Sequence, residues 1–248
     1  MTVSVVTVTY NAAATVELAV KSVLSQQGDF TLDYHIVDGG STDGTLDILG
    51  VHRGGISKIT SEPDGGLYDA MNRGVARAQG DIIGILNADD AYADSKVIAD
   101  ILQVFEKTGA DGVYADLDYV DAETATNVTR QWKSGEPGDF RKGWMPPHPT
   151  LFVKRSLYEQ HGLFNLQLRS AADYELMLRF FHFRGALLHY LPRTTVKMRA
   201  GGQSNASIAN RIKANAEDAK AWRLNGSPPP PLLRLVKPLR KIGQFAKR

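Results

Sequence analysis

Hydrophobic and polar residues follow two different periods along the first 110 residues. Short runs rich in β-branched residues, such as VSVVTVTY, have the pattern of buried strands. Between them, apolar residues recur every three or four positions, as Val16, Ala19, Val20 and Val23 do, which predicts amphipathic helices. The predicted strands are 3–10, 33–38, 56–60 and 81–86; the predicted helices are 13–26, a short one capped by Ser41 or Asp43 and ending at Leu49, 68–79 with Gly80 ending it, and 95–108.

This βαβαβαβ order predicts an α/β fold in which a mostly parallel sheet has helices on both faces. The second half is less regular, and its Gly/Pro-rich stretch 135–149 predicts a loop. Proline residues at 228–231 interrupt the chain, so we expect one domain over 1–226 and a tail over 227–248. The remaining predicted elements are a hairpin of strands 112–121 and 127–133, strands 150–155, 187–191 and 194–199, and helices 156–162, 173–184 and 205–223.

The composition is that of an ordinary globular protein, with 43% hydrophobic and 23% charged residues among 248. Because there is no cysteine, disulfides, Cys-based zinc sites and Cys nucleophiles are excluded. The N-terminal segment lacks the basic region of a signal peptide, and no stretch approaches the roughly 20 apolar residues of a membrane span. We therefore expect a cytoplasmic protein.

The net charge of +2 hides a difference between the body and the tail. Residues 228–248 contain six of the 29 basic residues and none of the 27 acidic ones, so the tail carries +6 and the body −4. A slightly acidic body argues against nucleic-acid binding. In the tail, Leu232, Leu235, Leu239 and Ile242 recur at helical spacing beside the basic residues, although Pro238 interrupts them.

Such a basic amphipathic tail favours peripheral docking on an anionic membrane, at the inner face of the cell membrane. A solubilising tail or a contact in a homodimer are the alternatives.

Polar residues follow each of the four predicted strands of the first half. In an open parallel sheet, ligands bind outside the carboxyl ends of the strands, which all lie at one edge. Four polar strand ends at one edge are poorly explained as solvated turns. They are Thr9, Tyr10 and Asn11 after the first strand, Asp38 after the second, Glu62 and Asp64 after the third, and Asp89 and Asp90 after the fourth.

The chain has no G-x-G-x-x-G, no P-loop and no H-E-x-x-H motif. Clustered carboxylates without cysteine or paired histidine favour a hard cation, Mn²⁺ or Mg²⁺, which usually binds together with phosphates. Asp90 is the candidate metal ligand, Asp38 is a candidate acceptor for a nucleobase imide N–H, and Tyr10 is a candidate for stacking on the base. Together these residues predict a site for a nucleoside diphosphate.

The segments TVTYNAAATVELAVKSVLSQ, IVDGGSTDGT and GDIIGILNADD resemble, in order and spacing, the family 2 inverting glycosyltransferases of the GT-A fold. EPDGGLYDAMNRGVARAQGD resembles especially the members that build bacterial surface polysaccharides. The resemblance covers about residues 2–200. It implies a Rossmann-like GT-A domain with a nucleotide-binding half at 1–110 and an acceptor-side half at 111–226, a nucleotide-diphospho-sugar donor, a divalent metal, and inversion at the anomeric carbon.

The resemblance also implies roles for individual residues. Thr9, Tyr10 and Asn11 match the first nucleotide-binding segment, and Asp38 matches the base-binding Asp. Asp89 and Asp90 match the DXD-like pair, in which the first Asp faces the ribose and the last holds the metal. In SAADYELMLR, Asp173 matches the catalytic base, although Ala172 stands where the family usually has Glu. The alternative for Asp173 is a helix N-cap.

Weaker candidates complete the predicted site. His148 lies in a Pro-rich loop on the acceptor side. Asp64 lies on the donor side. Tyr68, Asp69 and Asn72 open a helix that faces the donor cleft, and the alternative for Tyr68 and Asn72 is packing and capping the helix start. Arg199 with Gly201 and Gly202 could close over the diphosphate.

The expected reaction is transfer from a nucleotide-diphospho-sugar, with a UDP-sugar favoured, to a hydroxyl of a lipid-linked or growing cell-surface glycan. A nucleotidyltransferase is one alternative, but it would need a Gly-rich basic loop where NAAAT stands at 11–15. A catalytically inactive sugar-nucleotide binding module is the other. An acceptor at Asp38 would suit uracil, thymine or guanine.

Overall fold

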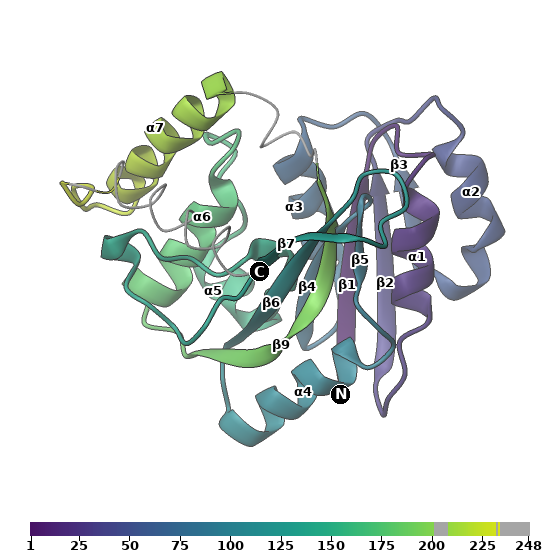
Figure 1. The fold of residues 1–248 in the computed structure, drawn as a ribbon, viewed down its shortest axis with the longest axis horizontal. Coiled ribbons are helices and arrows are strands. Elements are labelled where there is room, and N and C mark those ends of the chain that lie inside the picture. The colour runs from purple at the N-terminus through teal and green to yellow at the C-terminus, as the bar shows by residue number, and fades with distance from the viewer. Residues whose placement is uncertain (201–207, 232, 234–248) are drawn as a thin grey trace.

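Parallel strands form the nucleotide-side half of the chain. The computed structural model describes residues 1–200, 208–231 and 233. Its first four strands lie in the order β3-β2-β1-β4 and pair in parallel, so their carboxyl ends share one edge (Figure 1). Their bounds are β1 Thr2–Thr9, β2 Thr31–Asp38, β3 Lys58–Ser61 and β4 Ile82–Asn87, which confirms the predicted order of strands in this half.

The sheet continues past β4 with mixed pairing. Its further strands are β5 Asp90–Tyr92, β6 Gly112–Val120, β7 Val128–Trp132, β8 Phe152–Lys154 and β9 Leu188–Arg199. β6 and β9 are parallel, whereas β8, β7 and β5 are antiparallel to their neighbours. Within the described residues, the strands make one nine-stranded sheet in the order β3-β2-β1-β4-β8-β6-β9-β5, with β7 beside β6.

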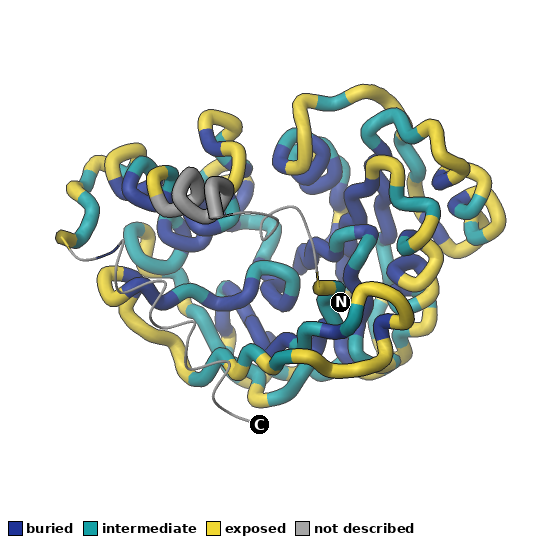
Figure 2. Tube along the Cα trace, turned by 45° about the horizontal axis from the view of Figure 1, so that its top comes forward, coloured by how far each residue is buried: buried dark blue, intermediate teal, exposed yellow. Residues whose placement is uncertain are grey.

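Helices cover both faces of this sheet, because the strands alternate their apolar side chains between two cores. Val3 and Val5 pack in the core that contains residues of α1, α2 and α4, whereas Val6 and Val8 pack in the core that contains residues of α3, α5, α6 and α7. Buried residues follow the strands and the inner sides of the helices, and the outer turns are exposed (Figure 2). The helices are α1 Val16–Leu24, α2 Thr45–Val51, α3 Leu67–Arg77, α4 Val97–Thr108, α5 Arg155–His161, α6 Ala172–Met177 and α7 Ile208–Leu224.

Several boundaries differ from the sequence prediction. The predicted helix 173–184 is α6 followed by a π-helical segment, Leu178–Phe183. The two strands predicted at 187–191 and 194–199 are one strand, β9. Leu191 pairs with Ala115 and Thr194 pairs with Asp116, so Pro192 and Arg193 form a bulge. In the bulge, Pro192 does not need the backbone N–H that proline lacks.

Two glycine and turn assignments also change. α3 ends at Arg77, so Gly80 does not end it. Gly80 instead packs against β1, where an added Cβ would lie 2.5 Å from the Ser4 nitrogen, so the lack of a side chain is what this position requires. Gly44 is the N-cap of α2, and Asp43 lies just before it, accepting a hydrogen bond from the Thr45 N–H at 3.1 Å. Short 3₁₀ turns lie at Arg53–Gly55, Phe140–Lys142 and His148–Thr150.

One residue of the predicted tail packs in the core. Leu233 is 2% exposed and lies in the same core cluster as Trp222 of α7. The division into a domain over 1–226 and a tail over 227–248 stays a prediction. Residues 234–248, on which most of the tail prediction rests, lie outside the described residues, as do Gly201 and Gly202. Over the ranges that the structure describes, none of the helices has the length and apolar character needed to cross a membrane.

Candidate active site

The strand ends that the sequence singled out meet at one edge of the sheet. Thr9 pairs with Asp38, and Asp38 pairs with Ser61, so the ends of β1, β2 and β3 are in register. The Ala88 N–H donates to the Val8 carbonyl, which brings the segment after β4 beside the end of β1. α3 starts six residues after the end of β3, so its first turn lies at this edge too.

Asp38 is fully buried, and its carboxylate is occupied. Oδ2 accepts from the N–H groups of Gly40 and Ser41 at 3.0 and 2.9 Å and from the Ser61 hydroxyl at 2.6 Å. Oδ1 accepts a short hydrogen bond from the Ser41 hydroxyl. A carboxylate offers about four acceptor positions, and one on Oδ1 is left by these donors. Asp38 organises the turn after β2, and because the side chain is fully buried it does not face a nucleobase in this conformation, contrary to the predicted role.

Asn11 fastens the first loop to the same turn. It has φ of 48°, a left-handed conformation that asparagine tolerates better than most residues. Its N–H donates to the Ser41 hydroxyl at 2.8 Å, and its Oδ1 accepts from the Thr42 N–H at 2.9 Å. These bonds give Asn11 a structural role in the loop and place the neighbouring Tyr10 at the surface, where its side chain is 65% exposed.

Tyr10 and Asp64 flank Gly39. A Cβ added to Gly39 would lie 2.8 Å from Asp64 Oδ2 and 3.3 Å from the Tyr10 ring. Only glycine therefore allows the carboxylate and the ring to approach each other over this backbone. Asp64 Oδ1 accepts from the Gly66 N–H at 2.8 Å. An exposed aromatic ring beside a partly exposed carboxylate suits a flat base with an N–H on its edge.

Asp90 is a buried carboxylate with little compensation. It is 1% exposed, and among the residues that the structure describes Oδ1 has no hydrogen-bond partner, while Oδ2 accepts from the Asn87 amide at 3.3 Å. The backbone of Arg199 also favours the charged form of Asp90. Burial and the charge of Asp89 raise the pKa of Asp90 well above its usual range. Burying a charge without partners is costly unless a cation or a proton compensates it. The half-buried Asp89 beside it makes a cation the better fit.

The environment of Asp90 fits Mn²⁺ or Mg²⁺ bound mainly by a ligand and water. Among the described residues, no group of three or more His, Asp or Glu side chains is arranged to hold a metal ion. Mg²⁺ sites commonly use one or two carboxylates with substrate phosphates and water as the remaining ligands. A diphosphate at this edge could supply those ligands.

Arg199 lies next to this carboxylate. Asp90 pairs with Met198 across β5 and β9, and Arg199 is the last residue of β9. Its guanidinium donates to the carbonyl oxygens of Ala122 and Glu123, at 2.6 and 3.4 Å, and its buried Nε has no partner in the ranges that the structure describes. Arg199 therefore holds the turn between β6 and β7 in this conformation.

Asp173 faces the same edge from the other half of the chain. It is the second residue of α6, and Ala171 is the N-cap, so the alternative role of Asp173 as an N-cap is excluded. Its Oδ1 accepts from the Tyr68 hydroxyl of α3 at 3.1 Å. The side chain is partly exposed, which leaves it accessible to a reactant.

His148 lies beside Asp173. Burial lowers the pKa of His148 below its usual range, and the Asp173 charge opposes that shift. The ring packs edge-on against Phe164, with centroids 5.7 Å apart. A neutral imidazole at this place can hydrogen-bond a hydroxyl but adds no charge to the site.

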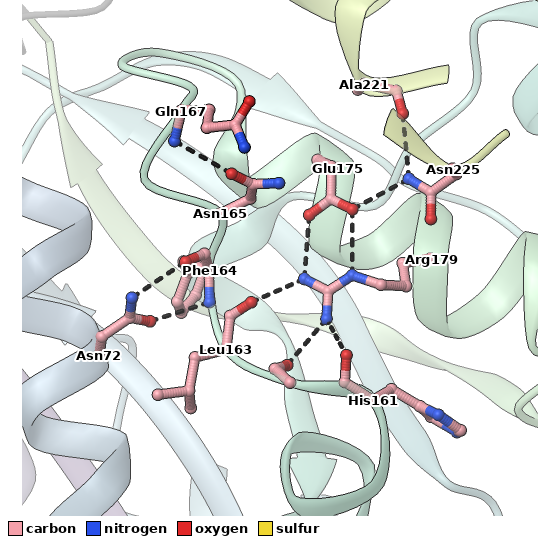
Figure 3. Close-up of polar contacts among 11 residues, drawn as sticks. Asn72, His161, Leu163, Phe164, Asn165, Gln167, Glu175, Arg179, Ala221 and Asn225 are labelled. Atoms are coloured by element: carbon pink, nitrogen blue, oxygen red, sulfur yellow. Dashed lines mark hydrogen bonds and ion pairs between the residues drawn. The ribbon is translucent and has the colours of Figure 1, made fainter. Parts of the chain in front are cut away.

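Asn72 does not face the donor side. Its amide donates to the Phe164 carbonyl at 2.9 Å, and its Oδ1 accepts from the Phe164 N–H at 2.8 Å (Figure 3). Both ends of the amide are thus used to join α3 to the loop before α6, and the predicted donor contact is replaced by a structural one.

Comparisons with known proteins agree with this arrangement. Residues 4–173 match the description Glycosyl transferase family 2, and the chain belongs to that family. An uncharacterized glycosyltransferase of Mycobacterium tuberculosis is 32% identical over 182 residues, covering 72% of this chain and 68% of the relative. A PGL/p-HBAD biosynthesis glycosyltransferase of Mycobacterium bovis is 31% identical over 214 residues, covering 83% and 80%.

Solved structures share the GT-A fold with this chain. S. aureus TarS 1-349 in complex with UDP-GlcNAc aligns with a TM-score of 0.71 and 19% identity, over 90% of this chain and 65% of that one. The mannosyltransferase PcManGT from Pyrobaculum calidifontis, in complex with GDP-Man and Mn²⁺, aligns with a TM-score of 0.66 and 20% identity, over 94% and 67%. The fold class predicted from the sequence is confirmed.

Proposed function

We propose that this chain is an inverting glycosyltransferase that moves a sugar from a nucleotide-diphospho-sugar to a hydroxyl group. The observation that supports this most is the pairing of two carboxylates from different halves at one sheet edge. Asp90 is buried, and its Oδ1 has no hydrogen-bond partner within the described part of the chain, whereas Asp173 is accessible and held by Tyr68. The first suits a cation beside a diphosphate, and the second suits a base.

The reaction would be a single displacement. Asp173 takes the proton of the acceptor hydroxyl as the hydroxyl oxygen bonds to the anomeric carbon. The bond from that carbon to the diphosphate oxygen breaks at the same time, and its electron pair leaves with the nucleoside diphosphate, so the anomeric configuration inverts. Mn²⁺ or Mg²⁺ held by Asp90, with Asp89 beside it, would neutralise charge on the leaving diphosphate. Such a step requires no covalent enzyme intermediate.

Base recognition is proposed for Tyr10 and Asp64 instead of Asp38. The Tyr10 ring is exposed for stacking, and Asp64 Oδ2 points over Gly39 toward it. A carboxylate there would accept the imide N–H of uracil, thymine or guanine, whereas cytosine lacks that donor. The liganded structures of TarS and PcManGT hold UDP-GlcNAc and GDP-Man, and both nucleobases meet this requirement. We favour a UDP-sugar.

A glycolipid or lipid-linked glycan is the proposed acceptor. The Mycobacterium bovis relative is named a PGL/p-HBAD biosynthesis glycosyltransferase and has a similar length, which supports an acceptor of this type. Asp173 and His148 would face the acceptor hydroxyl, since both belong to the second half of the chain.

A thermal-shift screen followed by product analysis tests the proposed function. With Mn²⁺ present, we expect UDP, dTDP or GDP to raise the melting temperature and CDP to leave it unchanged. A ligand at 100 times its dissociation constant stabilises the fold by about 2.7 kcal/mol, which is roughly 5–10 °C for a chain of this size. Asp64→Ala, which removes the acceptor, should remove the shift, and the matched change Asp29→Ala, on an exposed turn before β2, should retain it.

The same protein is then incubated with UDP-, dTDP- and GDP-sugars and octyl glycosides, and products are identified by mass spectrometry. Transfer to an octyl glycoside is the expected result. Binding without any transfer or donor hydrolysis would favour an inactive binding module, and a shift with CDP equal to that with UDP would reject the role of Asp64.

Peripheral membrane binding is proposed for the basic segment after Leu233. It carries Arg234, Lys237, Arg240, Lys241, Lys247 and Arg248. Each basic residue near an anionic surface contributes roughly 1 kcal/mol, less at high salt. The full chain should therefore sediment with phosphatidylglycerol liposomes, and truncation after Leu233 should abolish this while leaving the buried Leu233 in place. Equal sedimentation of both proteins, or equal binding to neutral liposomes, would reject the proposal, and loss of a dimer on truncation would assign the segment to a subunit contact.

A further inference from the structure

Tyr68 is a buried side chain that joins the two halves at the site. It is the second residue of α3 and is 8% exposed. Its hydroxyl donates to Asp173 Oδ1 at 3.1 Å, across 105 positions of sequence. A single buried hydroxyl therefore contacts the carboxylate proposed as the base.

Tyr68 and Asn72 of α3 both contact the same residue, Phe164. Tyr68 stacks on Phe164, with centroids 5.6 Å apart and planes 23° apart. One turn later on α3, the Asn72 amide makes two hydrogen bonds to the Phe164 backbone. Positions four apart lie on one face of a helix, so α3 contacts both the ring and the backbone of Phe164.

The loop that carries Phe164 is held in turn by the π-helical segment Leu178–Phe183, which follows the helix that carries Asp173. Arg179 donates to the carbonyl oxygens of Leu163 at 2.7 Å and Gly162 at 2.8 Å, and it contacts that of His161 (Figure 3). Two further bonds, at 3.0 and 2.9 Å, join Arg179 to the buried carboxylate of Glu175, two residues after Asp173. The contacts thus form a closed ring from Asp173 through Tyr68, Phe164 and Arg179 back to α6.

The Tyr68 hydroxyl also lies at the N-terminus of α6, which lacks a side-chain cap. Ala171, the N-cap of α6, has no side-chain oxygen to accept from the first N–H groups of the helix. Burial and the Asp173 charge raise the pKa of Tyr68 well above its usual range, while the backbone N–H groups of Asp173 and Ala172 act in the opposite direction. The phenol therefore keeps its proton and remains a hydrogen-bond donor over the whole working pH range.

We propose that Tyr68 is a positioning residue for Asp173, whose hydroxyl fixes the carboxylate by one oxygen so that the other oxygen faces the acceptor hydroxyl. This inference rests on the proposed function, in which Asp173 is the base. The hydroxyl does not touch the reactants. Its contribution should be lost whenever Asp173 is no longer a carboxylate base.

A double-mutant cycle of Tyr68→Phe and Asp173→Asn tests the proposal. The probe is the donor and octyl glycoside pair with the highest turnover. Tyr68→Phe removes one oxygen from a ring that stays packed on Phe164, and it should lower kcat about 10-fold, the usual scale for one hydrogen bond to a charged group, with the donor KM unchanged. In the Asp173→Asn background the same change should lower kcat no further.

Tyr158→Phe is the matched control, because Tyr158 is a buried tyrosine of α5 whose ring also packs on Phe164, at 6.3 Å. It should retain wild-type kcat. Wild-type kcat in Tyr68→Phe, an equal loss in both backgrounds, or a loss confined to KM would each overturn the positioning role. If Asp173→Asn alone keeps normal turnover, the base assignment fails instead, and the two failures are thereby distinguished.

Discussion

Replacing Asp173 by asparagine is expected to lower glycosyl transfer by at least about 100-fold while leaving donor binding unchanged. A positioned general base contributes typically 10²–10⁴-fold to a rate. Asparagine has nearly the same shape and can still accept from the Tyr68 hydroxyl, but its amide cannot take the acceptor proton. The site should therefore retain its geometry and lose its proton acceptor.

The measurement compares kcat for transfer with the dissociation constant for the nucleoside diphosphate, determined by calorimetry with Mn²⁺. Asp29→Asn, the same chemical change on an exposed turn away from the site, is the control and should have wild-type values. A kcat within a factor of about three of the wild type in Asp173→Asn would remove Asp173 from the reaction. A large loss of nucleotide affinity would instead place Asp173 on the donor side.

The order and type of most elements could be predicted from the sequence because local patterns decide them. Strand β1 is almost wholly β-branched, and α4 places Val97, Ile98, Ile101, Leu102 and Phe105 on one buried face. β5 escaped prediction because three residues give no period, and its pairing with β9 is made by residues more than 100 positions away. β9 was divided in two because Pro192 is a local strand breaker that only the bulge tolerates.

The strand order allowed the residues at the common sheet edge to be predicted, but the bonds that their side chains make could not be. Asp38 and Asn72 are polar residues at the expected places, yet their polar atoms bond to the protein itself. Asp38 accepts from backbone N–H groups of the turn that follows it, and Asn72 bonds to the backbone of Phe164. The sequence did not decide whether Tyr68 packs at the helix start or acts in the site, since its partner Asp173 lies 105 residues away.

The two halves of the site differ in how firmly they are bonded. Around Asp173, the ring of contacts through Tyr68, Phe164 and Arg179 leaves few polar groups unused. At the strand ends, three buried oxygens have no hydrogen-bond partner among the residues described: Thr9 Oγ1, Asn87 Oδ1 and Asp90 Oδ1. Unpaired buried acceptors are uncommon and often mark a place where a ligand or an ion completes the bonding. The donor side is therefore the half that we expect to change on binding.

Asp90→Asn is expected to abolish the metal-dependent part of nucleoside-diphosphate binding without harming the fold. The asparagine amide removes the negative charge that would hold the cation, whereas the contact of Oδ2 with Asn87 is long, at 3.3 Å, so little hydrogen bonding is lost there. The variant without ligand should melt at the wild-type temperature or above it, since an uncompensated charge has been removed from a buried site.

Calorimetry of UDP binding separates the metal-dependent part of the affinity from the part that needs no metal. With Mn²⁺, wild-type affinity should exceed that of Asp90→Asn by about 100-fold, equivalent to about 2.7 kcal/mol. With EDTA, the two proteins should bind UDP with the same weak affinity, because the base contacts at Tyr10 and Asp64 are untouched. Equal affinity of both proteins in Mn²⁺ would reject Asp90 as the metal ligand. If the variant binds UDP more weakly than wild type in EDTA as well, Asp90 acts on the nucleotide through the structure of the β4–β5 turn and not through a cation.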